Sequence, residues 1–417
     1  MRPPAKPILF INHAFGLSGS VISLGYIVRG FTQNGYQAFV VQKTNDKGAY
    51  YLRECGATVF CVHFSIGLSL CSAVDEASLN AFDLLFSFKN IIKIAFGMLL
   101  TWRYIVKVKP CLLYVNEYVL VHCSIIGKIM NIPTVMHVRG PILQGRWGIR
   151  RWLLRKMILK WNDKVIAITE IEARQLFHKN SRRTHKCIAS DVVIIYEFVK
   201  ESNTTDNLEI SKKGFSDVQT HKIVVTMLGG VSKIKGTLEF VISAKYLSRI
   251  LKDVVFIIAG PIYGGRGLRS AKRRFGINEK YTETVFQFVE RQNLFKRVKF
   301  VGELRNIEKL LRVTDVLVFP STISHFARPV IEAWSLKKPA IMTDNAHGRE
   351  LIKDGVDGLL VENRNPKALA EAIKKVLGDK TLAQRLGENG YKKMKRLFDA
   401  DTNLRKIIET CESLIIL

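Results

Sequence analysis

Several side chains that could bind a ligand or take part in catalysis follow one apolar run in the second half of the chain. The run VLVF is followed by PSTISHFARPVIEAWSLKKPA (320–340), which contains Ser324, His325 and a single acid, Glu332. In open parallel sheets, ligands bind beyond the carboxyl ends of the strands, so this loop is expected at a binding edge. Glu332 is expected on the first turn of the following helix. An acid there could equally do no more than stabilise the helix dipole.

Two glycine-bearing turns add a second kind of chemistry, the binding of an anion. The segments ILFINHAFGLSGSVISLGYIV (8–28) and IVVTMLGGVSKIKGTLEFVISA (223–244) each indicate a strand, a turn and a helix. Glycine lets the backbone approach an anion, and the helix that follows offers N–H groups at its positive end. One such loop is more often a simple tight turn. Two at equivalent places favour a phosphate site shared by two domains.

The length and the hydrophobic pattern predict two domains of one class. A chain of 417 residues exceeds the usual size of a single domain. Short apolar runs alternate with helix-length stretches in both halves, which predicts doubly wound α/β domains with parallel sheets. We expect an N-terminal domain at 1–200, a polar linker at 201–221, a second domain at 222–395 and a C-terminal helix at 396–417. This helix could return to the N-terminal domain.

The charge balance favours a polyanionic partner. The chain carries 64 Lys and Arg against 36 Asp and Glu, a formal net charge of +28, which suits nucleic acid, anionic lipid or a phosphorylated substrate. The seven cysteines show no zinc-binding spacing and are expected to be buried thiols in a reducing compartment. Basic residues interrupt the apolar stretch 82–108, so it predicts a long buried or interfacial helix rather than a membrane span. We expect a cytoplasmic protein.

The stretch that holds the lone acid also carries a recognisable motif. Its parts are, in order, Glu332-Ala333, Pro339, Gly348, Glu350 and GLLV (358–361). This arrangement resembles the signature region of family 4 glycosyltransferases, which are enzymes of the GT-B type. The resemblance implies two Rossmann-like, doubly wound parallel-sheet domains that face each other across a cleft.

Further motifs extend the resemblance through nearly the whole chain. LGGVSKIKG is similar to the family's phosphate-binding loop, with Lys235 near its end. IPTVMHVRG is similar to the strand that ends in the family's N-domain histidine, here His137. From the residues alone, this histidine could equally be a satisfied core side chain.

The resemblance implies a role for each matching position. Glu332 would bind the ribose hydroxyls of a sugar nucleotide, and His137 would lie near the sugar or the acceptor. The diphosphate would lie against Gly229, Gly230, Lys233 and Lys235, with Gly16, Ser18 and Gly19 closing from the other domain. The nucleobase would contact the backbone near Gly302 and Leu304.

Two positions depart from the family's pattern. Its first acid, eight residues before Glu332, is replaced by Ser324, and an arginine five residues before Lys235 is replaced by Gly230. A serine cannot supply the charge of a carboxylate beside the sugar. Either the donor pose is modified or activity is reduced, and His325 or Arg328 could compensate. The expected catalytic set is His137, Ser324 and Glu332.

The implied reaction moves a sugar, with retention, from a UDP- or GDP-linked donor to an acceptor hydroxyl. Fixed cations and N–H dipoles would stabilise the charge of the leaving diphosphate. Neither a metal ion nor another cofactor is expected. The acceptor would be a lipid-linked saccharide of bacterial surface polysaccharide or lipopolysaccharide synthesis, at the inner face of the membrane.

A basic segment that contains tryptophan is a candidate for contact with a membrane surface. Residues 118–162 contain no Asp or Glu, and their basic side chains are interleaved with Trp147, Trp152 and Trp161. Such a helix fits an anionic membrane surface. It fits equally a helix packed on its own domain with a solvated basic face. The basic groups expected to meet lipid are Arg150, Arg151 and Arg155.

Two rival functions stay open. A non-catalytic nucleotide-sugar-binding protein would keep Glu332 and Lys235 but, with Ser324 and Gly230, would have lost turnover. An RNA-binding protein would use the basic segments, including GGRGLRSAKRRFG (264–276). No RNA-binding signature accompanies these segments, so no nucleic-acid partner is expected.

Overall fold

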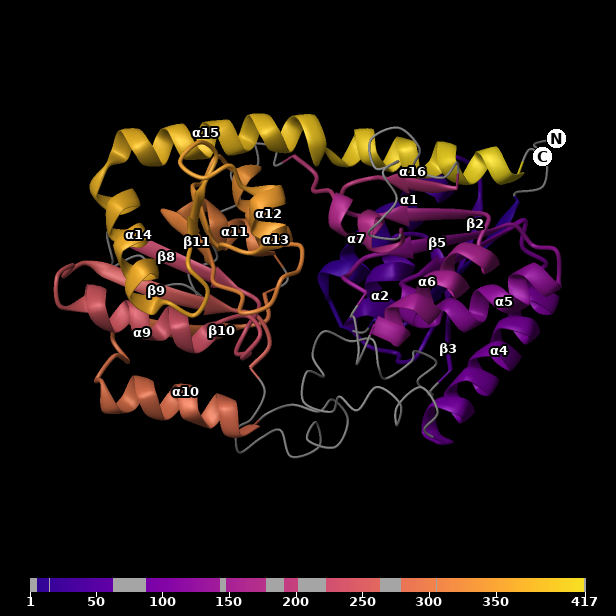
Figure 1. Ribbon diagram of the computed structural model, residues 1–417, viewed down its shortest axis with the longest axis horizontal. Coiled ribbons are helices and arrows are strands. Elements are labelled where there is room, and N and C mark those ends of the chain that lie inside the picture. The colour runs from indigo at the N-terminus through magenta and orange to yellow at the C-terminus, as the bar shows by residue number, and fades with distance from the viewer. Residues whose placement is uncertain are drawn as a thin grey trace. The chain divides into compact units, whose positions relative to one another are not determined.

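This computed structural model describes residues 6–14, 16–62, 88–142, 148–177, 191–201, 223–262, 279–304 and 306–415. The chain forms two compact units, the first made of Met1–Phe198 with Ala400–Leu417 and the second of Val199–Asp399 (Figure 1). The expected linker at 201–221 lies almost wholly outside the described residues, as does the basic cluster at 264–276.

The first unit is built on a parallel sheet. Within the described residues, its strands lie in the order β3, β2, β1, β4, β5, β6, β7. Their bounds are β1 Pro7–Asn12, β2 Gln37–Gln42, β3 Ala57–Cys61, β4 Leu112–Asn116, β5 Thr134–Val138, β6 Lys164–Ala167 and β7 Val192–Ile194. All neighbours pair in parallel. Strand β4 is buried along its whole length, as expected where helices cover both faces of a sheet.

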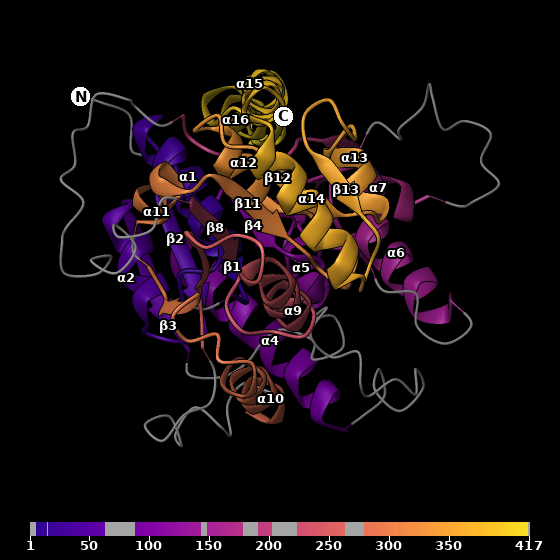
Figure 2. The ribbon, with the colours of Figure 1, turned by 90° about the vertical axis from the view of Figure 1, so that its left-hand side faces the viewer.

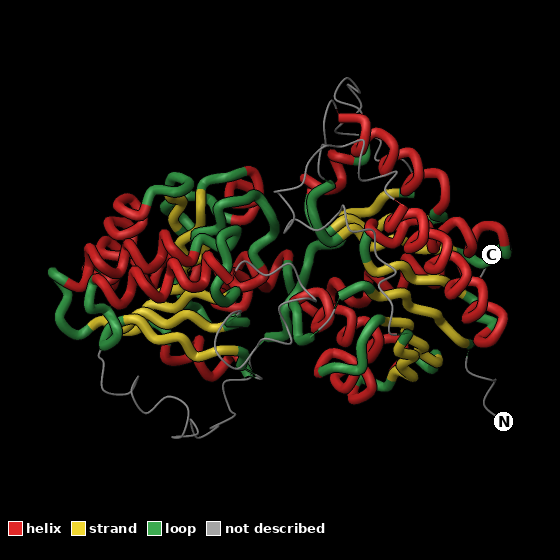
Figure 3. The backbone as a smooth tube through the Cα atoms, turned by 90° about the horizontal axis from the view of Figure 1, so that it is seen from below, coloured by secondary structure: helices red, strands yellow, loops and turns green. Residues whose placement is uncertain are grey.

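Successive side chains of β1 pack into two separate cores on opposite faces of the sheet. Phe10 belongs to the core beneath α1, α2 and α16, whereas Leu9 belongs to the core beneath α4, α5, α6 and α7. This follows from the alternation of side chains along a strand. Figure 3 shows helices on both sides of the strands. The bounds are α1 Gly19–Gln33, α2 Lys47–Glu54, α4 Phe88–Val108, α5 Val121–Ile129, α6 Ile149–Trp161, α7 Glu170–Gln175 and α16 Ala400–Ile415, with a 3₁₀ turn at Tyr118–Leu120.

The second unit repeats this plan with a smaller sheet. Its described strands lie in the order β10, β9, β8, β11, β12, β13, again all parallel. They are β8 Ile223–Leu228, β9 Val254–Ala259, β10 Val298–Gly302, β11 Val316–Phe319, β12 Ala340–Thr343 and β13 Leu359–Val361. The helices are α9 Thr237–Ser248, α10 Glu279–Arg291, α11 Ile307–Val313, α12 Arg328–Trp334, α13 Ala346–Leu351, α14 Pro366–Gly378 and α15 Lys380–Leu397.

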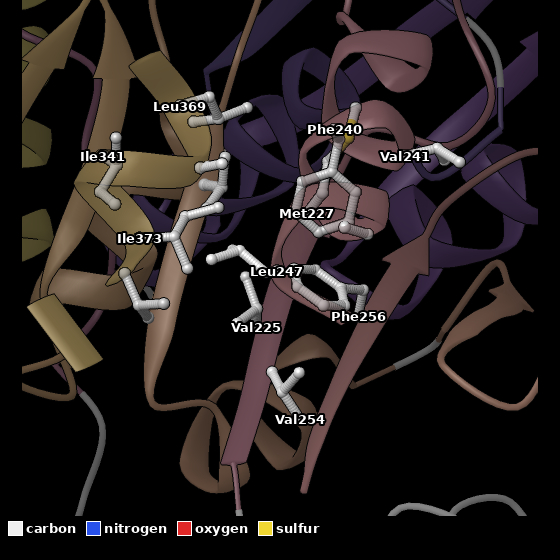
Figure 4. Close-up of a cluster of buried hydrophobic side chains, with 14 of the residues drawn as sticks. Val225, Met227, Phe240, Val241, Leu247, Val254, Phe256, Ile341, Leu369 and Ile373 are labelled. Atoms are coloured by element: carbon white, nitrogen blue, oxygen red, sulfur yellow. The ribbon is translucent and has the colours of Figure 1, made fainter. Parts of the chain in front are cut away.

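One face of the second sheet is covered by α9 and α14, which lie next to each other (Figure 2). Figure 4 shows the core beneath them, where Phe240 of α9 meets Phe256 of β9 with ring centroids 5.7 Å apart. Ile373 of α14 joins the same core. This packing fixes the start of α9, and with it the glycine turn that leads into the helix.

Each sheet reverses its strand order at one pair of neighbours. β1 lies beside β4 in the first sheet, and β8 lies beside β11 in the second. The connections on either side of such a reversal leave a crevice at the carboxyl ends of the strands. The predicted fold class is confirmed, because both units are doubly wound α/β domains. The two predicted glycine turns follow β1 and β8, at these reversals.

Helix α6 corrects one expectation about the basic segment. It packs on the first sheet through Leu154 and Ile158, and Arg150 is buried beside them. The expectation that Arg150 meets lipid is wrong, because the residue falls on the packed side of the helix. Arg151 is also engaged, donating from Nε to the carbonyl of Ile142 at 2.9 Å. Trp147 lies outside the described residues.

A close helix contact in the second unit yields a stability prediction. A Cβ added to Gly390 of α15 would lie 2.2 Å from Cδ1 of the fully buried Trp334. We expect Gly390→Ala to lower the free energy of unfolding by about 2 kcal/mol, because overpacking outweighs the better helix propensity of alanine. Urea unfolding measures the difference. Gly378→Ala, whose Cβ would meet nothing within 4 Å, is the control and should not destabilise the protein.

Candidate functional site

The turn after β8 has no room for side chains at two of its glycines. Gly230 and Gly236 have positive φ angles of 72° and 74°. A Cβ would lie 2.1 Å from the carbonyl oxygen of Pro261 at Gly230, and 1.9 Å from that of Pro320 at Gly236. The backbone of this turn therefore lies directly against the segments that follow β9 and β11. The arginine that the family carries at Gly230 would not fit this turn.

Hydrogen bonds join this turn to the loop that follows β11. The Ser321 hydroxyl donates to the carbonyl of Ile234 at 2.7 Å, and the Thr322 hydroxyl donates to that of Lys233 at 3.1 Å. Lys233 itself is exposed. These bonds hold two predicted segments, distant in sequence, at one edge of the sheet.

Lys235 and His325 meet across this junction. Lys235 Nζ lies 2.6 Å from His325 Nε2 and 5.2 Å from the centroid of the Phe319 ring. Burial lowers the pKa of the lysine ammonium to about 8. Burial and the neighbouring lysine hold the pKa of His325 well below its usual value. The imidazole is therefore neutral, and since an ammonium can only donate, Nε2 accepts from Lys235.

Ser324 is tied to the start of α13. Its hydroxyl lies 2.8 Å from His347 Nδ1 and 3.3 Å from Asn345 Oδ1, and it accepts the N–H of His347 at 3.2 Å. Sequence reasoning missed His347. The motif around Gly348 does not indicate that a side chain there reaches the position of the family's first acid.

Glu332 is placed differently from the expectation. The structure starts α12 at Arg328, so Glu332 lies on the second turn and no acid occupies the first. The prediction of a first-turn position is wrong because the helix begins before Pro329. Its carboxylate Oε1 accepts from Arg328 Nε at 2.8 Å, and both side chains are largely buried. A helix-dipole role is weakened, because that effect fades beyond the first turn.

The predicted nucleobase positions lie at the same edge of the sheet. Gly302 ends β10 with a φ of 70°, and its carbonyl accepts the N–H of Gly260 at 2.8 Å. Leu304 follows two residues later and is partly buried. The segments that follow β8, β10, β11 and β12 thus lie at one edge of the second sheet. These segments carry the site residues that were predicted for this unit.

The glycine turn of the first unit is more occupied than expected. The Gly16 N–H donates to Asp46 Oδ2 at 3.0 Å, and Ser18 caps α1 by accepting the N–H of Val21 at 3.4 Å. Gly19 is the first residue of α1. The N–H of Gly16 is therefore already bonded, which is a weaker anion site than the sequence suggested.

His137 lies at the end of β5 in a dense polar cluster. Its Nδ1 contacts the Tyr114 hydroxyl at 2.6 Å and Arg139 Nη2 at 3.3 Å. Burial, followed by the arginine charge, holds the pKa of His137 well below its usual value. Arg139 can only donate, so Nδ1 accepts and the proton of the neutral ring is on Nε2. This Nε2 is buried and has no hydrogen-bond partner.

Two acids that sequence reasoning missed complete the cluster. Glu197 Oε2 accepts from Arg139 Nη1 at 2.8 Å, and both side chains are buried. Glu117, directly after β4, has a φ of 133°, an uncommon backbone conformation that concentrates at functional sites. Its Oε1 accepts the N–H groups of Tyr118 at 2.9 Å and Arg139 at 3.3 Å. Burial raises the pKa of Glu117 to about 8.

Within the described ranges, no three His, Cys, Asp or Glu side chains are grouped so as to hold a metal ion. The chemistry that the second unit offers is an ammonium, a carboxylate and hydroxyl groups beyond the strand ends. The first unit offers an unpaired imidazole N–H at the matching edge of its own sheet.

Comparison with known proteins shows which family the second unit resembles. Residues 210–393 match glycosyl transferases group 1. The capsular polysaccharide biosynthesis glycosyltransferase CapM of Staphylococcus aureus is 22% identical over 271 residues, 65% of this chain and 67% of that protein. The UDP-Gal:alpha-D-GlcNAc-diphosphoundecaprenol alpha-1,3-galactosyltransferase of Escherichia coli is 26% identical over 173 residues, 41% of each. The chain thus aligns with only part of the length of these relatives.

Solved structures extend the likeness to both units. HepE of Anabaena, in complex with UDP and glucose, has a TM-score of 0.74 at 19% identity, covering 98% of this chain and 100% of that one. A glycosyltransferase from Rickettsia africae has a TM-score of 0.72 at 17% identity, covering 99% of each chain. The resemblance seen in the sequence is confirmed. The chain has the GT-B fold, and its residues 210–393 match the family model of glycosyl transferases group 1.

Proposed function

We propose that this protein transfers a sugar from a nucleoside diphosphate sugar to an acceptor hydroxyl, in the synthesis of a bacterial polysaccharide or glycoconjugate. The observation that carries the proposal is the position of Lys235, at the strand-order reversal of a group 1 glycosyltransferase domain. Its ammonium lies 2.6 Å from His325 Nε2, and two glycines of its turn, Gly230 and Gly236, have no room for a side chain.

The donor diphosphate would take the place of His325 as the partner of Lys235. An ammonium beside the leaving phosphates stabilises the negative charge that develops as the sugar departs. Neither a metal ion nor a further cofactor enters this proposal, in which Lys235 supplies the positive charge. The N–H groups of Gly229 and Gly230 already donate to the carbonyl of Ala259, at 2.9 and 3.0 Å.

Glu332 would bind the ribose hydroxyls. Arg328 fixes the orientation of the carboxylate through the 2.8 Å contact. Ser324 and His347 would lie against the sugar, offering a hydroxyl and an imidazole where the family has a carboxylate. We propose that transfer of the hexose proceeds with retention, as the family resemblance implies.

The first unit would serve the acceptor. His137 Nε2 is a buried donor without a partner, so it would donate to a hydroxyl of the sugar or acceptor. We propose a lipid-linked saccharide as acceptor, because one relative acts on a diphosphoundecaprenol-linked sugar. Another is named for lipopolysaccharide core biosynthesis. This substrate would keep the protein at the inner face of the membrane.

One observation favours a second candidate function. Ser324 stands at the position of the family's first acid, and its hydroxyl is bonded to His347. A nucleotide-sugar-binding protein without turnover would tolerate this arrangement. Tight binding of UDP or GDP by calorimetry, with neither donor hydrolysis nor transfer to any acceptor, would favour this alternative.

The enzyme proposal predicts the effect of removing either charged group. Lys235→Ala and Glu332→Ala should each lower the transfer rate by about 100-fold, because each removes a charge-assisted contact to the bound donor. Transfer from UDP- and GDP-hexoses to a lipid-linked acceptor is measured, with thermal melting as the folding check. Lys252→Ala removes an exposed lysine that precedes β9, and it should change the rate less than threefold. Near wild-type rates in both site variants would refute the site.

The pKa of Lys235 also predicts how nucleotide binding depends on pH. Below pH 8 the ammonium is charged in the empty site, whereas above pH 8 it must take up a proton to bind a diphosphate. The affinity for UDP or GDP should therefore fall above pH 8, by up to about tenfold per pH unit. Calorimetry at several pH values measures it. Lys235→Met should flatten the profile, and an equally steep profile in that variant would contradict the assignment.

The buried Glu117 predicts a pH-dependent stability of the first unit. Its pKa is raised from 4.5 in the unfolded chain to about 8 in the folded protein, so its contribution is complete below pH 4.5 and is lost as the pH rises through 8. Glu117→Gln keeps an acceptor oxygen and removes the titration. The melting temperature of the variant should fall less than that of the wild type between pH 5 and pH 9. Parallel curves would show that this carboxyl is not protonated in the fold.

A further inference from the structure

The outward face of α4 carries large apolar side chains that are exposed in the described part of the structure. Five of them, in a helix of 21 residues, are between 42% and 56% exposed. They are Ile91, Ile92, Leu99, Trp102 and Val106. The opposite face is firmly packed, since Thr101 and Ile105 are buried and the Thr101 hydroxyl donates to the carbonyl of Gly97 at 2.7 Å.

The exposed residues form one continuous stripe. An α-helix turns by about 100° per residue, and on this spacing the five positions fall within a single arc of about 100°. Ala95, also exposed, lies inside the same arc. Scattered exposed apolar residues are common, but a contiguous stripe of this kind marks a surface that meets an apolar phase or a partner.

Basic residues border this stripe and acids are absent from it. Arg103 and Lys107 are exposed on one side of the arc, and the Lys107 ammonium lies 4.7 Å from the Phe60 ring centroid. The sequence has no Asp or Glu from 84 to 116. Basic side chains beside an apolar stripe are typical of a helix that lies in a lipid interface, where they reach the phosphates.

Helix α6 extends the same surface. α4 and α6 both contact α5, and all three cover one face of the first sheet. On the outer side of α6, Trp152 is 46% exposed, with Lys156 Nζ 4.0 Å from its ring centroid. The combination of apolar and basic side chains is therefore repeated on a second helix of this layer.

We propose that α4, supported by the outer side of α6, is a docking surface for an anionic lipid bilayer. The helix lies flat, with the stripe in the acyl boundary and Arg103 and Lys107 among the headgroups. None of the described helices is long and apolar enough to cross a membrane, which agrees with a helix that lies on the surface. A second copy of this chain would bring an equally basic stripe against this one, whereas anionic lipid neutralises it.

Only the purpose of this docking surface rests on the proposed function, since it would bring a lipid-linked acceptor to the site. The test itself needs no turnover. Full-length protein is sedimented with vesicles of phosphatidylglycerol and phosphatidylcholine, and with phosphatidylcholine alone. Thermal shifts with UDP and GDP are recorded for every variant. A loss of vesicle binding with unchanged nucleotide shifts separates this surface from the nucleotide site.

The apolar contribution is tested with a substitution that leaves the charge unchanged. Leu99→Gln with Trp102→Gln should weaken binding to anionic vesicles at least tenfold, with an unchanged melting temperature. The matched control, Tyr246→Gln with Ile250→Gln, removes two similarly exposed apolar side chains from the second unit and should stay within twofold. In the wild type, brominated lipids should quench a component of tryptophan fluorescence that Trp102→Phe removes.

The charge contribution has its own matched pair. Arg103→Gln with Lys107→Gln should weaken binding to anionic vesicles several-fold and reduce its salt dependence. The control is Lys392→Gln with Arg396→Gln, which removes two exposed charges at the same spacing from α15. The proposal is overturned if the α4 variants bind like the wild type. It is also overturned if light scattering shows a wild-type dimer that α4 substitutions dissociate while no form binds vesicles.

Discussion

Close backbone packing, with no space for a Cβ, fixes the turn that carries Lys235. Gly230 and Gly236 press against the carbonyls of Pro261 and Pro320, and hydrogen bonds from the loop after β11 close the same junction. The backbone of Lys235 is therefore fixed, whereas its ammonium is placed by the contact with His325 Nε2 at 2.6 Å. A rigid turn beneath the cation limits how far it can move when a ligand arrives, which favours the stabilisation of developing charge.

The polar groups predicted to bind the donor in the second unit are already paired within the chain. Glu332 is bonded to Arg328, Ser324 to His347, and Lys235 to His325. These partners have different consequences for a ligand. A carboxylate keeps acceptor capacity when one oxygen is bonded to an arginine, whereas the bond between Lys235 and His325 must yield to a phosphate. The lysine pair is the one that a ligand would change most.

The sequence was sufficient for the class of fold and for the edges at which chemistry can occur. Apolar runs separated by helices predict buried parallel strands, and the turns at Gly16 and Gly229 predict where two strands end. The pairing of side chains could not be predicted in the same way. His347 reaches Ser324 from 23 residues away, and Glu197 reaches Arg139 from 58 residues away. Such contacts depend on the order of strands in the sheet, which periodicity does not encode. The position of Glu332 was missed for a local reason, because one residue before Pro329 already belongs to the helix.

The first unit is completed by the last residues of the chain. Helix α16 packs on α1, with Ile407 and Cys411 in the shared core, and the Tyr36 hydroxyl donates to Glu412 at 3.0 Å. A ribosome therefore releases all of residues 199–399 before these core residues emerge. The nascent first unit must wait with an apolar face of α1 open to water while the second unit can already close. The part of the protein made first is, for this reason, the part that finishes folding last.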